Sequence, residues 1–254
     1  RLQPINDDRA MALAKARQEG AKDLWQGLAQ FDIIDAPGPW SPKSETELVI
    51  FDTLSGRMHP RMACEALVAA LETKSCLVKA DGEPQGIVVE ATGWKGLRAL
   101  ADQMEQPVGN GVKGQAAVLE FATPLDAPQL FADALHIIPH ANGTIAIGST
   151  SEREFDDASS TDAQLDDVIV RARQAFPVLA DAPVIERWAG VRPRAKSRAP
   201  MIGHHPLRKG AFIANGGFKI GFGMAPKIAE VMADLILEGA DQIPEGFRPE
   251  ASLR

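Results

Sequence analysis

The spacing of apolar residues along the chain predicts four helices, because each repeats at intervals of three and four positions. Capping residues and prolines mark several of their ends. The predicted helices are residues 7–30 with Asp7 or Asp8 as cap, a segment that begins at Pro60, a segment that follows the capping-box pattern of residues 161–164 and stops at Pro177, and a segment that starts near Pro226 and stops at Gly239.

Short β-branched runs and local alternation predict strands between these helices. Residues 135–149 form the clearest hairpin, with Asn142-Gly143 expected to supply the two positive φ angles of a tight turn. The run at 86–93 is typical of a buried strand that ends in a turn. The other predicted strands are residues 47–53, 115–121, 184–191, 200–203 and 211–214. This mixture indicates an α/β or mixed α+β fold.

Composition and charge narrow the function classes. The 254 residues are 45% hydrophobic and 24% charged, a balance typical of globular proteins. The net charge of -7 argues against a nucleic-acid partner, since that affinity rests on clustered positive charge. No apolar run is long enough for a membrane span. The two cysteines and the absence of a signal-peptide profile favour a reducing, cytoplasmic location.

Several candidate motifs for binding or catalysis do not meet the requirements of their chemistry. Residues 109–114 match the pattern G-x-G-x-x-G, but a dinucleotide site needs a strand before it and a helix after it. Here a proline precedes the match and a predicted strand follows, so we expect a flexible loop. The histidines and cysteines lack the spacing of a zinc site, and we expect no metal. No G-x-S-x-G elbow supports a serine hydrolase.

A second glycine cluster, residues 215–226, connects a predicted strand to the last helix. Dense glycines let the backbone approach a planar ligand, and a helix N-terminus offers N–H donors to an electron-rich group. The alternative interpretation is a tight turn without a ligand.

Arg192 lies in the segment of residues 188–193, next to Trp188 in sequence. An arginine that faces a cavity binds a carboxylate through two parallel hydrogen bonds. The alternative is an arginine on the surface, which is the commoner case for an isolated residue of this type.

In order and spacing these pieces resemble the D-amino acid oxidase family of flavoproteins, and most nearly its glycine oxidase and sarcosine oxidase-like branch. The resemblance covers roughly residues 57–240. The matching elements are residues 88–94, Lys113-Gly114-Gln115, residues 138–139 with 144–150, residues 188–193, residues 199–203, and residues 216–221 with Ala225-Pro226.

The resemblance implies a discontinuous, two-domain organisation. The expected FAD-binding domain is Rossmann-like and comprises residues 57–113 and 189–254. The expected substrate-binding domain is built on an antiparallel sheet and comprises residues 1–56 and 114–188. The strand, G-x-G-x-x-G turn and acidic residue with which the family opens do not occur in this sequence. We therefore expect the FAD-binding domain to be incomplete here and the chain to be part of a longer protein.

The resemblance also implies an FAD enzyme that removes a hydride from the Cα of an amino acid or N-substituted amine and gives an imine. It implies that Arg192 binds the substrate carboxylate across the flavin from the glycine turn. Lys219 would be a second contact to substrate or flavin, and His136 a residue in the roof of the site. The expected cofactor-binding residues are Ala91, Thr92, Gly93, Trp94, Gly217, Phe218, Lys219, Ile220, Gly221, Phe222 and Gly223.

Several points depart from the family's pattern or stay open. Glycine oxidases carry Arg where this chain has Lys219 and Tyr where it has His136, and the chain contains no tyrosine. Lys219 pointing to solvent and His136 packing in the sheet are the alternatives for these two residues. A second hypothesis is a non-catalytic or subunit form that acts as a binding module without FAD. The expected partner is a small amine or amino acid carboxylate, and a homo-oligomer is left open.

Overall fold

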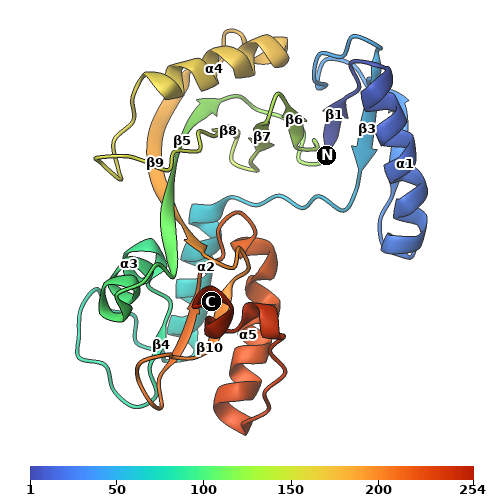
Figure 1. Ribbon diagram of the computed structural model, residues 1–254. Coiled ribbons are helices and arrows are strands. Elements are labelled where there is room, and N and C mark those ends of the chain that lie inside the picture. Colours follow the sequence, from blue (N-terminus) through green and yellow to red (C-terminus); the bar gives the residue numbers. More distant parts are fainter. The chain divides into compact units, whose positions relative to one another are not determined.

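The chain folds into two compact units, and the computed structural model describes all residues from 1 to 254 (Figure 1). The first unit comprises Arg1–Val78, Gln115–Thr150 and Ser160–Ala189, and the second comprises Lys79–Gly114, Ser151–Ser159 and Gly190–Arg254. Residues 57–78, expected with the cofactor domain, cluster with the first unit. The mixture of helices and sheets confirms the predicted mixed α/β class.

The first unit is organised around a largely antiparallel sheet in the order β2-β3-β1-β6-β7-β8-β5-β9. β1 pairs antiparallel with β3 and parallel with β6. β7 and β8 form an antiparallel hairpin in which Pro139 lies opposite Ile145. The strands are β1 Leu2–Pro4, β2 Phe31–Asp35, β3 Leu48–Asp52, β5 Gly109–Glu120, β6 Leu130–Ala132, β7 Leu135–Pro139, β8 Thr144–Gly148 and β9 Val184–Ala195.

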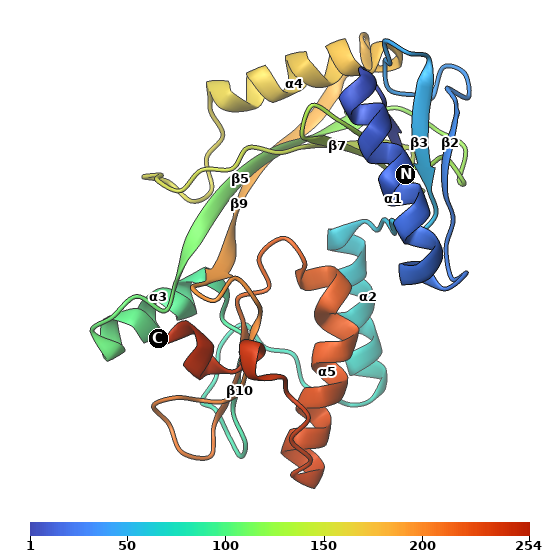
Figure 2. The same ribbon diagram turned by 45° about the vertical axis from the view of Figure 1, so that its right-hand side comes forward.

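Helices cover this sheet through the apolar faces that the sequence predicts. α4 (Ala163–Ala175) lies along this sheet (Figure 1). The Asp162 side chain caps the helix, and Leu165, Val168 and Ala172 are buried in the main core. α1 (Asp8–Trp25), capped by Asp7, runs beside β2 and β3 (Figure 2). α2 (Pro60–Thr73) begins at the predicted proline but buries none of its residues.

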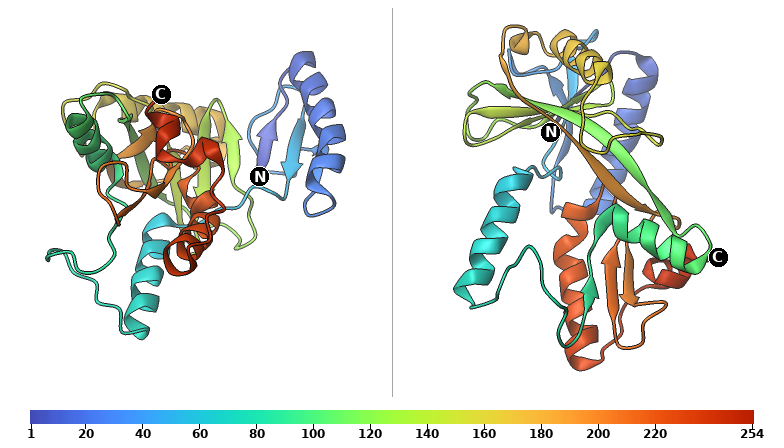
Figure 3. Two further views of the ribbon diagram at one scale, coloured as in Figure 1. Left: turned by 60° about the horizontal axis from the view of Figure 1, so that its bottom comes forward. Right: turned by 90° about the vertical axis from the view of Figure 1, so that its left-hand side faces the viewer.

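The second unit contains a three-stranded sheet in the order β10-β11-β4, with a helix on each face (Figure 3). Its strands are β10 Met201–His204, β11 Phe212–Asn215 and β4 Val89–Glu90, and its helices are α3 Gly93–Met104 and α5 Gly221–Glu238. Successive side chains of a strand point to opposite faces. Met201 and Ile213 accordingly pack with α3, whereas Ile202 and Phe212 pack with α5. Short 3-10 turns lie at Pro177–Leu179, Glu245–Phe247 and Pro249–Ser252.

The G-x-G-x-x-G match belongs to a strand, so the expected flexible loop at residues 109–114 is wrong. These residues form the first half of β5, whose neighbour in the sheet is β9. A Cβ on Gly109 would lie 2.5 Å from the Arg194 carbonyl oxygen, and one on Gly111 would lie 2.5 Å from Val191 Cγ1. The glycines therefore serve the close approach of two strands, which sequence pattern alone does not distinguish from a phosphate-binding turn.

Three other local predictions need correction. The run at 86–93 forms only the two-residue β4, and Val89 is 42% exposed, so this strand is not buried. In the β7–β8 turn Gly143 alone has a positive φ, of 79°, because four residues connect the strands instead of two. α5 begins at Gly221, five residues before Pro226, so the proline lies inside the helix and not at its first position.

Candidate functional site

A glycine-rich turn joins β11 to α5 in the second unit. Gly216 has a φ of 74°, and a Cβ there would lie 2.8 Å from the Ala195 Cβ. A Cβ on Gly217 would lie 2.9 Å from the Gly221 Cα. Both contacts are closer than real side chains tolerate, so the turn requires glycine at these two positions.

Asn215 ties this glycine turn to the turn that follows β4. Its buried side chain donates a hydrogen bond to the Gly93 carbonyl oxygen at 2.9 Å and accepts one from the Gly216 N–H at 2.7 Å. The two segments that the sequence assigns to the cofactor, around Gly93 and Gly217, are therefore held together by one side chain.

A cavity of about 810 Å³ opens beside the glycine turn. This volume falls in the range of small-molecule and cofactor sites, roughly 300–1,000 Å³. No side chain caps the N-terminus of α5, which Ile220 precedes. Its first-turn N–H groups therefore suit an electron-rich partner. The walls, the glycines and these N–H groups fit a flat, largely apolar ring with polar edges.

Seven of the eleven predicted cofactor-binding residues line this cavity. They are Ala91, Gly93, Gly217, Phe218, Lys219, Gly221 and Phe222. Of the others, Thr92 lines a separate cavity of about 300 Å³. The Trp94 ring packs edge-on against the Phe155 ring, with 5.9 Å between the ring centres. Ile220 is the N-cap of α5, and Gly223 lies in its first turn.

The prediction missed one wall of the cavity. The additional lining residues are Val89, Pro193, Ala214, Asn215, Gly216, Ala225, Ile228, Ala229, Met232, Ala233 and Ile236. Most of them belong to one face of α5, on which Ala225, Ala229 and Ala233 recur every four positions. That spacing is visible in the sequence, but helical periodicity does not say which apolar face packs in the core and which lines a cavity.

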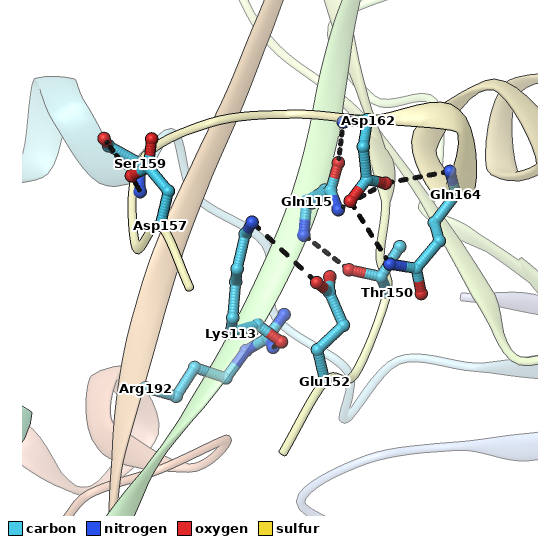
Figure 4. A network of polar contacts seen from close by, with 9 residues as sticks. All are labelled: Lys113, Gln115, Thr150, Glu152, Asp157, Ser159, Asp162, Gln164 and Arg192. Atoms are coloured by element: carbon cyan, nitrogen blue, oxygen red, sulfur yellow. Dashed lines mark hydrogen bonds and ion pairs between the residues drawn. The ribbon is translucent and has the colours of Figure 1, made fainter. Parts of the chain in front are cut away.

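Arg192 lies in the part of β9 that belongs to the second unit. Its guanidinium rests against Gly114, where a Cβ would lie 2.5 Å from the Arg192 Cζ and nearer still to both Nη atoms. Its Nη1 donates to the Lys113 carbonyl oxygen at 3.5 Å (Figure 4). Burial lowers the pKa of Arg192 from its ordinary value, and the nearby Glu152 carboxylate opposes that shift. A guanidinium stays charged under these conditions.

The segment that follows Arg192 pairs with the glycine turn. The Phe218 N–H donates to the Pro193 carbonyl oxygen at 2.9 Å, and Arg194 and Gly217 form an isolated antiparallel bridge. Pro193 itself lines the cavity. The backbone carrying Arg192 and the glycine turn are therefore neighbours, as the resemblance implies.

Lys219 is exposed and lines the cavity from the glycine turn. Its Nζ and the Arg194 guanidinium each lie 5.6 Å from the centre of the Phe218 ring. Cations at this distance are attracted by the negative face of an aromatic ring. The ring thus lies close to two positive charges, and a contact of Lys219 to substrate or flavin stays a prediction.

His136 lies in β7 of the first unit, paired with Gly148 of β8. Its side chain is exposed, and its ring lies 4.7 Å from that of Phe131. The residue is therefore not packed in the core of the sheet. Its place in the roof of the site stays a prediction, as does the assignment of the two units to cofactor and substrate.

The comparison with known families decides the family to which the chain belongs. Residues 7–235 match the DAO family, described as FAD dependent oxidoreductase. The chain belongs to this family. The match confirms the predicted family and FAD as the cofactor that the family uses.

Curated relatives place the chain near the glycine oxidase branch. It is 32% identical to the glycine oxidase of Pseudomonas putida over 190 residues, which are 73% of this chain and 50% of that protein. It is 25% identical to the glycine oxidase of Geobacillus kaustophilus in an alignment 252 positions long, which covers 86% of this chain and 67% of that protein. The chain thus spans between half and two thirds of these relatives' length.

Solved structures support the same fold. The glycine oxidase of Geobacillus kaustophilus has a TM-score of 0.76 at 20% identity, over 97% of this chain and 73% of that chain. The iminodiacetate oxidase of Chelativorans sp. BNC1 has a TM-score of 0.80 at 19% identity, over 98% of this chain and 74% of that chain. No helix of the structure has the length and apolar character to cross a membrane.

Proposed function

We propose that the protein to which this chain belongs oxidises an amino acid or N-substituted amine at its Cα to an imine. The observation that carries the proposal is the pairing of the Arg192 segment with the glycine turn, through the Phe218 N–H and the Pro193 carbonyl oxygen at 2.9 Å. It brings a carboxylate-binding side chain and a cavity suited to a flat ring into one unit.

Arg192 would bind and orient the substrate. A planar guanidinium that donates two parallel hydrogen bonds to a carboxylate fixes both the position and the direction of the neighbouring Cα. Fixing a substrate in this way removes much of the entropic barrier to a reaction. The contact with Gly114 supports this role, because it restricts where the guanidinium lies before substrate arrives.

The glycine turn and the start of α5 would hold the flavin ring. When bound there, FAD would supply the two-electron oxidation, in which the substrate loses a hydride from Cα and a proton from its nitrogen and is left as an imine that water hydrolyses. The unpaired first-turn N–H groups of α5 stabilise negative charge at the edge of whatever ring lies in the cavity. Gly216 and Gly217 let the turn pack closely against Ala195 and Gly221, since neither position has room for a side chain.

Spectroscopy and substrate screening of the full-length protein test the proposal. We expect visible flavin absorption after reconstitution with FAD, and bleaching by a small amino acid or amine when oxygen is absent. Glycine, sarcosine, D-amino acids and aminophosphonates make up the first panel. A protein without flavin bands would instead support the alternative of a binding module that does not use FAD.

Two variants test the role of Arg192. Arg192→Ala is expected to raise KM and lower kcat/KM for carboxylate substrates while the flavin stays bound. Arg192→Lys keeps the charge but loses the planar fork, so it is expected to recover only part of the loss. Unchanged kinetics in Arg192→Ala would remove the assignment of the carboxylate to this residue.

A further inference from the structure

A buried ion pair lies beside Arg192 in the second unit. Lys113 Nζ and Glu152 Oε2 are 3.8 Å apart, and their side chains are only 4% and 9% exposed (Figure 4). The two residues also exchange backbone hydrogen bonds in both directions, each 2.9 Å long. Burying two charges is costly, so such a pair calls for a reason beyond stability.

Arg192 belongs to the same cluster of charges. Its Nη1 donates to the Lys113 carbonyl oxygen, its guanidinium rests on the next residue, Gly114, and the Glu152 carboxylate acts electrostatically on it. The three side chains carry two positive charges and one negative charge, which leave a formal charge of +1. Buried charges are weakly screened, so adding or removing one of these three charges changes which anions Arg192 attracts.

We propose that the Lys113–Glu152 pair sets the charge of the carboxylate site at +1, so that it favours substrates with one carboxylate over those with two. The inference rests on the proposed role of Arg192. Without Glu152 the cluster would carry +2, which suits a dianion. Without Lys113 it would carry no net charge, which suits neither anion. Lys113 and Glu152 are positioning residues, because they act through Arg192 and not on the reacting atoms.

A purely structural role for the pair makes a different prediction. The pair also ties the segment Ser151–Ser159 to β5 through its two backbone hydrogen bonds. If that is its only role, substitutions change stability and leave the choice between one and two carboxylates untouched. Removing one charge would then leave the other buried without a partner and lower the stability, and removing both together would restore much of that stability.

The test measures anion binding by calorimetry on the full-length, FAD-loaded protein at pH 7.5, with acetate and malonate as probes. The proteins compared are the wild type, Glu152→Gln, Lys113→Met and the double variant. Glu152→Gln is expected to raise the affinity for malonate relative to acetate tenfold or more, or about 1.4 kcal/mol. Lys113→Met is expected to weaken both anions at least tenfold. The double variant, again at +1, is expected to return both affinities to within threefold of the wild type.

The malonate-to-acetate ratio separates the two roles, because only the charge model predicts that it changes in the single variants. An unchanged malonate-to-acetate ratio in Glu152→Gln overturns the proposal, as does a double variant that binds acetate as weakly as Lys113→Met. If Glu152→Gln does not fold, the same ratio is measured in Lys113→Met, where it should fall because a dianion loses more attraction than a monoanion; a wild-type ratio there overturns the proposal.

Arg192→Met distinguishes failure of this inference from failure of the proposed function. Acetate binding that survives in Arg192→Met refutes the carboxylate role of Arg192 and, with it, the inference. Acetate binding that is lost in Arg192→Met, with equal ratios in the four other proteins, refutes the charge-setting role alone.

Discussion

Gly114 leaves room for the Arg192 guanidinium, and its replacement by alanine should displace that group while leaving the fold intact. A Cβ at position 114 would lie 2.5 Å from the Arg192 Cζ, whereas ordinary van der Waals contact begins at 3.4 Å. The guanidinium must therefore move by about 1 Å. It is the far end of a flexible side chain, so it can move without shifting the backbone.

The expected effect is a loss of catalysis without a loss of stability. A misplacement of about 1 Å can cost roughly 100-fold in rate, so kcat/KM for a carboxylate substrate should fall about 100-fold, or about 2.7 kcal/mol. Gly114 lies in β5 without a left-handed φ, so alanine fits its backbone. Restricting the unfolded chain should then stabilise the protein by about 0.4–1 kcal/mol.

Steady-state kinetics and urea unfolding of Gly114→Ala measure the two quantities separately. Gly20→Ala is the matched control, because Gly20 lies within α1 and a Cβ there meets no atom within 4 Å. This control should gain stability and keep its kcat/KM. If Gly114→Ala also keeps the wild-type kcat/KM, then either the position of the guanidinium does not matter to the reaction or Arg192 does not bind the substrate.

Two further substitutions test the cofactor turn and a buried histidine. Gly216→Ala places a Cβ 2.8 Å from the Ala195 Cβ at a φ of 74°, so the ratio of flavin to protein absorbance should fall. A wild-type ratio would show that the turn does not hold FAD. Burial, His59 and Arg57 lower the pKa of His140 from 6.5 to about 4. As pH falls from 6.5 toward 4, His140 is protonated in the unfolded chain but stays neutral in the native protein. The free energy of unfolding therefore decreases over this pH range. The drop in unfolding free energy between pH 7.5 and pH 5 should shrink in His140→Asn, and an equal drop would contradict the assignment.

Residues that are close together in the sequence determined the helix ends and the β7–β8 hairpin. Asp7 caps α1 as expected, α4 is capped by Asp162 and not by Thr161, the first residue of the capping-box pattern, and Gly239 ends α5 with a φ of 70°. The hairpin of β7 and β8 follows from its apolar runs and turn residues. These features depend on neighbours within about four positions, which is the range that a sequence pattern records.

Features that depend on distant neighbours were misread or missed. The glycines of residues 109–114 looked like a loop because the pattern does not reveal β9, against which Gly109 and Gly111 pack. The two-residue β4 looked buried because a β-branched run does not reveal how much of a short edge strand its neighbours cover.

The candidate site divides in the same way. The sequence by itself determined the residue types, with Arg192 and the glycine turn placed by their resemblance to a flavoprotein family, and the match over residues 7–235 confirms that family. Only the tertiary structure revealed that Gly114 supports the guanidinium, that Lys113 and Glu152 form a buried pair beside it, and that one face of α5 lines the cavity. Burial and charge pairing arise between segments far apart in the chain, and no spacing along the sequence encodes those distances.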